Sequence, residues 1–309
     1  ENKIPCTTSD IFRMASQTKA ITATAVLMLM EEGKLLLDDP IKKYIPEFAN
    51  PRVIESFNEK DSTYTSRPAK RDITIRHLLT HTAGYSYGNA QTRKIYDKAG
   101  IPVSPMLSND NITLAEAIKR VASCPLEHDP GEKFTYGMSL DILGYLIEVV
   151  SKMPVDEFFK KRIFEPLGMN DTYFYVPEHK KDRIVTLYEK LNPEAKLIRN
   201  EKNNGLFQTL PYAGAKKFHS TGAGLNGTIE DYAKFCQMIL NKGEFNGHRI
   251  LGRKTVELMA KNAVGDLRGE IGFGLAFDDF RSLYSYRSII SQGALRWGGW
   301  YGTDYVIDP

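Results

Sequence analysis

One segment near the start of the chain restricts the fold more than any other. Residues 11–32 are predicted to form a helix with apolar side chains on nearly every face, among them Ile21, Val26 and Leu29. Gly33 is a typical residue to end it. The longest apolar run, residues 20–30, is shorter than the roughly 20 residues that span a bilayer. We therefore expect this helix at the centre of a globular core, and no transmembrane helix.

Composition and charge exclude several classes of protein. The 309 residues are 42% hydrophobic and 26% charged, which is typical of a soluble globular protein of one large or two ordinary domains. The net charge is +3, and no basic stripe interleaved with aromatic residues is present, so we expect no nucleic-acid partner. Cys6, Cys124 and Cys236 are odd in number and far apart, which predicts neither a disulfide framework nor a metal site.

The remaining pattern predicts helices in the middle of the chain and strands at its end. Thr113 and Glu116 form a capping box that opens a helix to Ser123, and residues 139–151 have helical spacing. Residues 50–71 are polar and are expected to form a surface loop. The segments 172–176 and 183–187 are expected to be strands, and residues 272–308 are β-rich.

The strongest chemical signal is the sequence Ser16-Gln17-Thr18-Lys19. A serine and a lysine three residues apart share one face of a helix. The start of a helix supplies free N–H groups, which suit a nucleophile whose reaction intermediate carries an oxyanion. A lysine desolvated by an apolar helix can lose its proton and act as the base. By itself this short pattern is more often an exposed serine and lysine on a helix.

Several longer segments, spread over almost the whole chain, are similar to segments of one known family and occur in the same order. The nucleophile segment Phe12 to Lys19 resembles that of the serine β-lactamase and D,D-peptidase superfamily. Further similar segments are Leu78 to Gly84, Asp129 to Tyr136, Glu165 to Thr172, Gly222 to Tyr232, and Trp297-Gly298-Gly299. The chain is most similar to the family VIII carboxylesterases, beside the class C β-lactamases.

The resemblance implies a site and a fold. Ser16, Lys19 and Tyr136 would be catalytic, and the N–H groups of Ser16 and Trp300 would form the oxyanion hole. Met138, Trp297, Gly298 and Gly299 would bind substrate. The implied fold is α/β, of the α+β type: an antiparallel sheet flanked by helices, from residues 1–34 and 219–309, with a mostly helical domain inserted at 35–218. We expect the sheet domain to be incomplete at both ends of this chain.

Two departures from the family pattern bear on the substrate. Met138 stands where the lactamases have an asparagine, and Trp297 stands where they have a lysine. Neither side chain can bind the acylamino group or the carboxylate of a β-lactam as those residues do. Arg296 neighbours Trp297, but alternate strand residues face opposite sides, so we expect it to point away from the cleft.

The sequence therefore predicts a serine hydrolase that acts through an acyl-enzyme on Ser16, with a small ester as substrate and no metal or organic cofactor. A β-lactamase or D,D-peptidase on the same scaffold is one alternative, and a non-catalytic binding protein that senses a peptidoglycan or β-lactam ligand is another. The glycines at 222–227 are interpreted as a turn rather than a nucleotide site, and His77 and His81 as structural. Tyr284, Tyr286, Trp297, Trp300 and Tyr301 line either a pocket mouth or a core. Oligomeric state and compartment, whether cytoplasmic, periplasmic or secreted, stay open.

Overall fold

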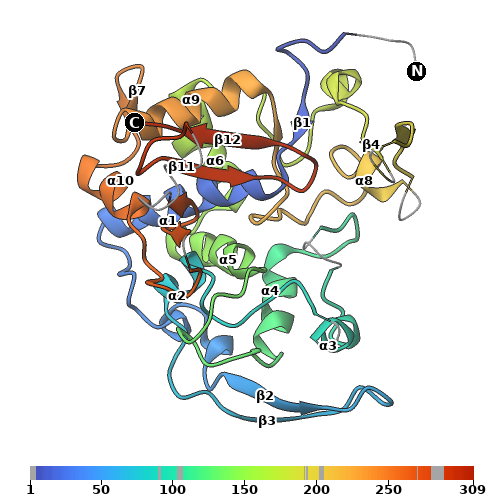
Figure 1. The fold of residues 1–309 in the computed structure, drawn as a ribbon, viewed down its shortest axis with the longest axis vertical. Coiled ribbons are helices and arrows are strands. Elements are labelled where there is room, and N and C mark those ends of the chain that lie inside the picture. Colours follow the sequence, from blue (N-terminus) through green and yellow to red (C-terminus); the bar gives the residue numbers. More distant parts are fainter. Residues whose placement is uncertain are drawn as a thin grey trace.

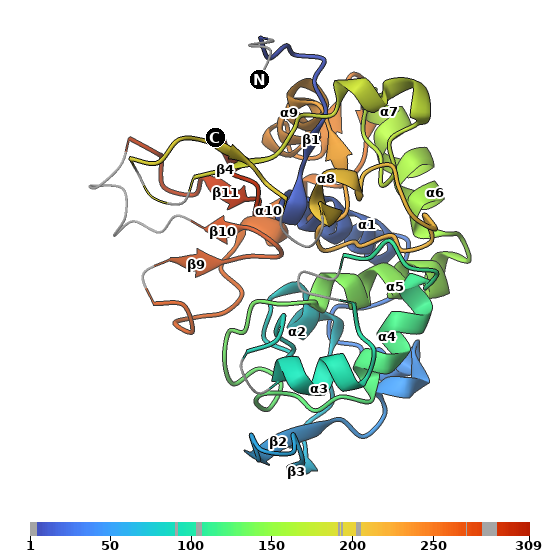
Figure 2. The same ribbon diagram turned by 90° about the vertical axis from the view of Figure 1, so that its right-hand side faces the viewer.

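The computed structural model describes residues 5–89, 92–102, 107–190, 192, 194–201, 205–269, 271–279 and 289–309. The chain enters through strand β1 (Phe12–Arg13), a 3-10 helix η1 (Ala15–Gln17) and helix α1 (Thr18–Glu31). In Figures 1 and 2, α1 runs through the middle of the molecule, between the strands near the C-terminus and the helix α5 (Ser139–Ser151). Twelve of its 14 residues, Thr18 to Leu29, are buried, as its apolar faces predict.

Strands from the last third of the chain form a four-stranded antiparallel sheet in the order β12–β11–β10–β9. Their bounds are Asp304–Ile307 (β12), Leu295–Gly298 (β11), Asp278–Asp279 (β10) and Gly272–Phe273 (β9). Strand β1 pairs with β6 (Asn226–Gly227) in a separate two-stranded sheet. Helices α9 (Ile229–Leu240) and α10 (Arg253–Ala260) follow β6, and α9 packs against β12.

The segment between α1 and β6 is mostly helical. Its helices are α2 (Ile75–Leu79), α3 (Thr92–Lys98), α4 (Leu114–Ala122), α5, α6 (Val155–Phe159), α7 (Glu165–Leu167) and α8 (Leu206–Thr209). Short 3-10 helices lie at Ile41–Lys43, Pro46–Phe48 and Glu178–Arg183, and a π-helical turn, Lys160–Phe164, joins α6 to α7. The hairpins are β2 (Arg52–Phe57) with β3 (Tyr64–Pro68), β4 (Tyr188–Glu189) with β5 (Ile198–Arg199), and β7 (Glu244–Phe245) with β8 (His248–Arg249).

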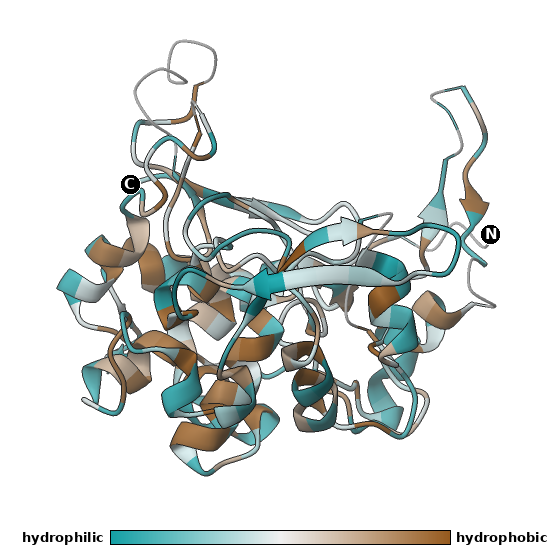
Figure 3. Cartoon of the chain, turned by 90° about the horizontal axis from the view of Figure 1, so that it is seen from below, coloured by the Kyte–Doolittle hydropathy of each residue, from teal (hydrophilic) through white to brown (hydrophobic). Residues whose placement is uncertain are grey.

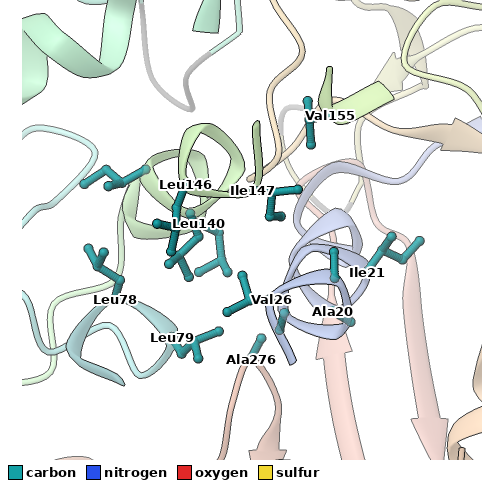
Figure 4. Close-up of a cluster of buried hydrophobic side chains, with 14 of the residues drawn as sticks. Ala20, Ile21, Val26, Leu78, Leu79, Leu140, Leu146, Ile147, Val155 and Ala276 are labelled. Carbon is teal, nitrogen blue, oxygen red and sulfur yellow. The ribbon is translucent and has the colours of Figure 1, made fainter. Parts of the chain in front are cut away.

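The core lies where α1, α2 and α5 meet. Figure 4 shows Val26 of α1, Leu79 of α2 and Leu140 of α5 pointing toward one another, and all three are fully buried. Close approach at α5 depends on Gly144, because a Cβ there would lie 2.1 Å from Thr221 Oγ1. This contact holds the segment before β6 against α5, and both contribute to the site described below.

Figure 3 shows hydrophobic and hydrophilic residues alternating along the helices, whereas the hairpin β2–β3, which crosses the front of that view, is mostly polar. None of the helices in the described part of the chain combines the length and the apolar character needed to cross a bilayer. The fold class expected from the sequence, an antiparallel sheet flanked by helices, is confirmed. The domain boundaries at 1–34, 35–218 and 219–309 stay a prediction.

The predictions from short-range sequence pattern were confirmed for helices that bury one face. The capping box of Thr113 and Glu116 is present, and α5 has the predicted bounds. Three others were wrong. The first helix begins at Thr18 rather than at residue 11, because residues 12–13 form strand β1 and pair with β6. Residues 50–71 contain the hairpin β2–β3 instead of a loop, which the sequence did not indicate because the half-exposed strands show no clear alternation of apolar and polar residues. The segments 172–176 and 183–187 each form a single β-bridge instead of a strand.

Candidate active site

Ser16 lies at the junction between β1 and α1, in the middle of η1. Ala15, just before it, has a φ of 46°, in the left-handed region that most residues avoid. The Met14 N–H donates to Leu225 O, which fixes this bend to the segment before β6. The serine is half-buried, and the next two side chains, Gln17 and Thr18, are buried. The strained bend therefore presents the Ser16 hydroxyl at the start of a buried helix.

Lys19 lies one turn further along, and its side chain is only 1% exposed. Its Nζ donates to Ser16 Oγ at 3.3 Å, to Tyr87 Oη at 2.7 Å and to the carbonyl oxygen of Gly222 at 2.8 Å. An ammonium has three N–H donors, so each of them has an acceptor. This arrangement stabilises a positive charge immediately beneath the serine.

Tyr136 reaches the same serine from 120 residues away in the sequence. Its hydroxyl donates to Ser16 Oγ at 2.7 Å, and Lys19 Nζ lies 4.7 Å from the centre of its ring. The spacing of Ser16, Lys19 and Tyr136 is that of a nucleophile with two proton-transfer partners. The structure thus brings together the three residues that the sequence singled out.

His81 holds the tyrosine in place. Its carbonyl oxygen accepts from the Thr135 N–H at 2.7 Å, its Nδ1 accepts from the Gly137 N–H at 3.4 Å, and its ring lies 4.7 Å from that of Tyr136. Complete burial lowers the pKa of His81 well below its usual value, with the positive charge of Lys19 adding to the effect. The imidazole is therefore neutral. Its Nε2 is buried with no hydrogen-bond partner among the described residues, and the structural role expected from the sequence stays a prediction.

Strand β11 closes the site from the sheet side. The Trp297 ring lies 5.4 Å from the Tyr136 ring, and Trp297 Nε1 is buried with no hydrogen-bond partner within the described ranges. Gly299 lies against the nucleophile segment, because a Cβ there would be 2.4 Å from the carbonyl oxygen of Met14. Thr303 Oγ1 also donates to that carbonyl. The turn that carries Trp300 is therefore tied to the residue two positions before Ser16.

Three groups in the site were not singled out in the sequence: Tyr87, Asp141 and the carbonyl of Gly222. Burial raises the pKa of Tyr87 well above its usual value, with the nearby Tyr136 and Asp141 adding to the effect, so its hydroxyl stays protonated. Tyr87 follows the Leu78 to Gly84 segment, and Asp141 lies five residues after Tyr136. Nearness to these motifs was the only signal in the sequence, since neither residue has a spacing that indicates chemistry.

The other predicted residues have different surroundings. Met138 is 2% exposed and belongs to the buried hydrophobic core at the start of α5, which argues against its role in substrate binding. Arg296 is paired with Asp304 on the exposed side of β11, away from the Trp297 ring, as expected. Trp300 is 80% exposed. Tyr284 and Tyr286 lie outside the described residues.

Comparison with known proteins places this geometry in a family. A family model described as Beta-lactamase matches residues 1–309. The chain belongs to the beta-lactamase family. It is 30% identical to "Esterase EstB" of Burkholderia gladioli over 98% of this chain and 76% of that protein. It is 29% identical to a "Putative D-alanyl-D-alanine carboxypeptidase" of Escherichia coli K12, over 100% of this chain and 68% of that protein.

A solved structure with the same fold is "EstCE1, a hydrolase with promiscuous acyltransferase activity". The TM-score is 0.80 at 27% identity, and the alignment covers 99% of this chain and 79% of that one. This beta-lactamase-family chain is accordingly an enzyme, a serine hydrolase with a penicillin-binding-protein-like fold.

Proposed function

We propose that this family member is a carboxylesterase for small acyl esters, with Ser16 as the nucleophile. The observation that carries the proposal is the pair of contacts at Ser16 Oγ, with Tyr136 Oη at 2.7 Å and Lys19 Nζ at 3.3 Å. A serine hydroxyl is a poor nucleophile without an adjacent base, and here two proton-transfer groups converge on it.

Tyr136 is the base in the proposed reaction, and Lys19 is its electrostatic partner. In the proposed reaction Lys19 is an ammonium, since its Nζ has three oxygen acceptors, and its charge lies 4.7 Å from the centre of the Tyr136 ring, where it favours a phenolate. The reactive form has Tyr136 as the phenolate and Ser16 as the neutral hydroxyl. When Ser16 Oγ attacks the ester carbonyl carbon, its proton moves to the Tyr136 phenolate oxygen. The ester C–O bond then breaks, and the leaving alkoxide takes that proton.

The acyl-enzyme is hydrolysed by the same groups in reverse. A water molecule gives its proton to Tyr136 and bonds to the acyl carbon, the bond to Ser16 Oγ breaks, and Ser16 recovers the proton. The N–H groups of Ser16 and Trp300 bind the oxyanion in both steps, each contributing about 3 kcal/mol. The Trp300 N–H donates no hydrogen bond to any residue in the described ranges, which leaves it available.

The charge around Trp297 favours neutral acyl groups over β-lactams. Trp297 carries no charge, and Arg268, which stacks 5.9 Å from the Trp297 ring, is paired with Asp278. Within the described residues, a β-lactam carboxylate therefore meets no unpaired arginine stacked on the Trp297 ring. A lost hydrogen bond to a charged group reduces binding by about 1.5–3 kcal/mol, which corresponds to roughly 10- to 150-fold.

A substrate panel tests this preference. We expect kcat/KM for a short-chain aryl ester to exceed that for a chromogenic cephalosporin and for a D-alanyl peptide by at least ~10-fold, the smallest loss of one charged hydrogen bond. Cephalosporin or peptide hydrolysis at or above the ester rate would establish a β-lactamase or D,D-peptidase instead.

Covalent labelling tests the nucleophile. A serine-reactive fluorophosphonate is expected to add one label per chain, on Ser16, and Ser16→Ala should lose both the label and turnover. Ser9→Ala, a control at an exposed serine on the same N-terminal segment, should keep both. Labelling elsewhere with an active Ser16→Ala would refute the assignment, and an unlabelled, inactive wild type would favour a non-catalytic binding protein.

A further inference from the structure

The inference concerns Asp141, a fully buried carboxyl group on α5 that the proposed reaction does not use. Its Oδ1 accepts from the Gly222 N–H and from Ser220 Oγ, each at 2.9 Å. Its Oδ2 is buried and has no hydrogen-bond partner within the described part of the chain. A purely structural role would need only the first oxygen, and an asparagine would supply it equally well. The negative charge thus calls for a separate explanation.

The unpartnered oxygen faces the site. A Cβ on Gly222 would lie 2.4 Å from Asp141 Oδ2 and 3.1 Å from Tyr87 Oη, so both oxygens approach the same side of this glycine. The Gly222 carbonyl and Tyr87 Oη are two of the three acceptors of Lys19. Asp141 is therefore separated from Lys19 by one layer of groups that the lysine itself contacts.

The groups facing Asp141 include one cation. Lys19 comes from α1, Tyr87 from the segment before α3, and Ser220, Thr221 and Gly222 from the segment before β6. Burial raises the pKa of Asp141 to about 6, while the charge of Lys19 and the hydrogen bonds from Gly222 and Ser220 oppose this effect. At neutral pH the carboxyl is thus mostly ionised. A buried charge is costly unless an opposite charge lies near it.

We propose that Asp141 is a positioning residue that keeps Lys19 positively charged from a place that substrate does not reach. It acts as the counter-charge of the buried ammonium, through Tyr87 and Gly222, and so determines when the Ser16–Tyr136 pair can exchange its proton. The inference rests on the proposed function for its catalytic consequence, but the charge pair itself does not depend on turnover.

The first test is the pH profile of kcat/KM for an aryl ester. Removing a nearby negative charge makes proton loss from the site easier, so Asp141→Asn should move the acid limb about one pH unit toward lower pH. The control is Thr221→Val, which removes the hydrogen bond from Thr221 Oγ1 to Leu140 O beside Asp141 without changing charge. Its acid limb should stay at the wild-type pH. An unmoved limb in Asp141→Asn would overturn the proposal.

The second test uses unfolding and needs no activity. Lys19→Met leaves the Asp141 charge unpaired, and Asp141→Asn leaves the Lys19 charge unpaired. Because paired buried charges are coupled, the double variant should unfold at a higher temperature than Lys19→Met alone. If the melting temperature of the double variant falls by the sum of the two single-variant decreases, the charge pair is contradicted. If Ser16→Ala keeps turnover, the proposed function fails, while this unfolding cycle still decides the role of Asp141.

Discussion

At the scale of single residues, Lys19 and Tyr136 share one task. Both contact Ser16 Oγ, and Lys19 Nζ lies over the Tyr136 ring, so we propose that they act as one proton-transfer unit. Sequence reasoning made Lys19 the base because an apolar helix would desolvate it. The proposed reaction instead assigns the base to Tyr136, because three oxygen atoms lie within hydrogen-bonding distance of Lys19 Nζ and suit an ammonium.

We expect the two residues to act non-additively. Lys19→Ala and Tyr136→Phe should each reduce kcat at least ~100-fold, as loss of general acid–base catalysis does, and the double variant should be little worse than the poorer single one. Steady-state kinetics with an aryl ester measures this. Tyr175→Phe, whose hydroxyl bonds to Phe218 O elsewhere, should retain wild-type kcat. Multiplicative losses in the double variant would argue against a shared task.

At the scale of elements, the site depends on how closely α5 packs against the segment before β6. Gly144 lies in the interior of α5, where helix propensity alone predicts that alanine is better by about 1 kcal/mol. The tertiary contact predicts that alanine destabilises the protein instead, since its Cβ would lie 2.1 Å from Thr221 Oγ1. Thr221 neighbours Gly222, so pushing this segment away also moves an acceptor of Lys19.

Gly144→Ala is therefore expected to lower the free energy of unfolding by about 1–3 kcal/mol, the usual cost of overpacking, and to reduce kcat as well. Urea unfolding and ester kinetics measure the two effects. The control is Gly33→Ala at the end of α1, where φ is +70° and nothing lies within 4 Å of the added Cβ. It should cost about 1 kcal/mol of backbone strain and leave kcat unchanged. A more stable Gly144→Ala would show that propensity outweighs the contact.

At the scale of the whole molecule, an ion pair between a partly exposed arginine and a buried aspartate ties the hairpin β2–β3 to the segment that carries Tyr136. The Asp129 side chain is fully buried and accepts from Arg67 Nη1, Arg67 Nη2 and the Lys70 N–H. The hydrogen bonds from Arg67 hold the pKa of Asp129 well below its usual value. Because the folded-state pKa is depressed, the stability it supplies is present above the unfolded-state value of about 3.9 and is lost as the pH falls below it.

Asp129→Asn should therefore lower the urea midpoint at pH 7, and the difference from wild type should stay constant down to about pH 4.5 and shrink at lower pH. Urea unfolding across that range provides the measurement. Glu132→Gln, at a partly exposed acid that also pairs with Lys70, should change the midpoint little. A deficit that persists unchanged at pH 3 would mean that the carboxylate charge of Asp129 is not what stabilises the hairpin.

The sequence by itself determined the buried helix near the N-terminus, the capping box at Thr113, and the placing of Ser16 and Lys19 one turn apart. Short-range pattern was sufficient for these because each signal concerns residues within about one helical turn of one another. The fold class and the choice of Tyr136, which lies 120 residues from Ser16, came instead from the resemblance of longer segments to the family.

Only the tertiary structure decided which groups complete the site and which leave it. Tyr87 and the Gly222 carbonyl meet at Lys19, and Asp141 lies behind them against Gly222. The three come from segments far apart in the chain, and no local pattern distinguishes them from other buried polar groups. Met138 was chosen by its position after Tyr136, but the start of α5 turns it into the core. The direction of a side chain and the neutralisation of a buried charge depend on packing between distant elements, so they are fixed only when the chain folds.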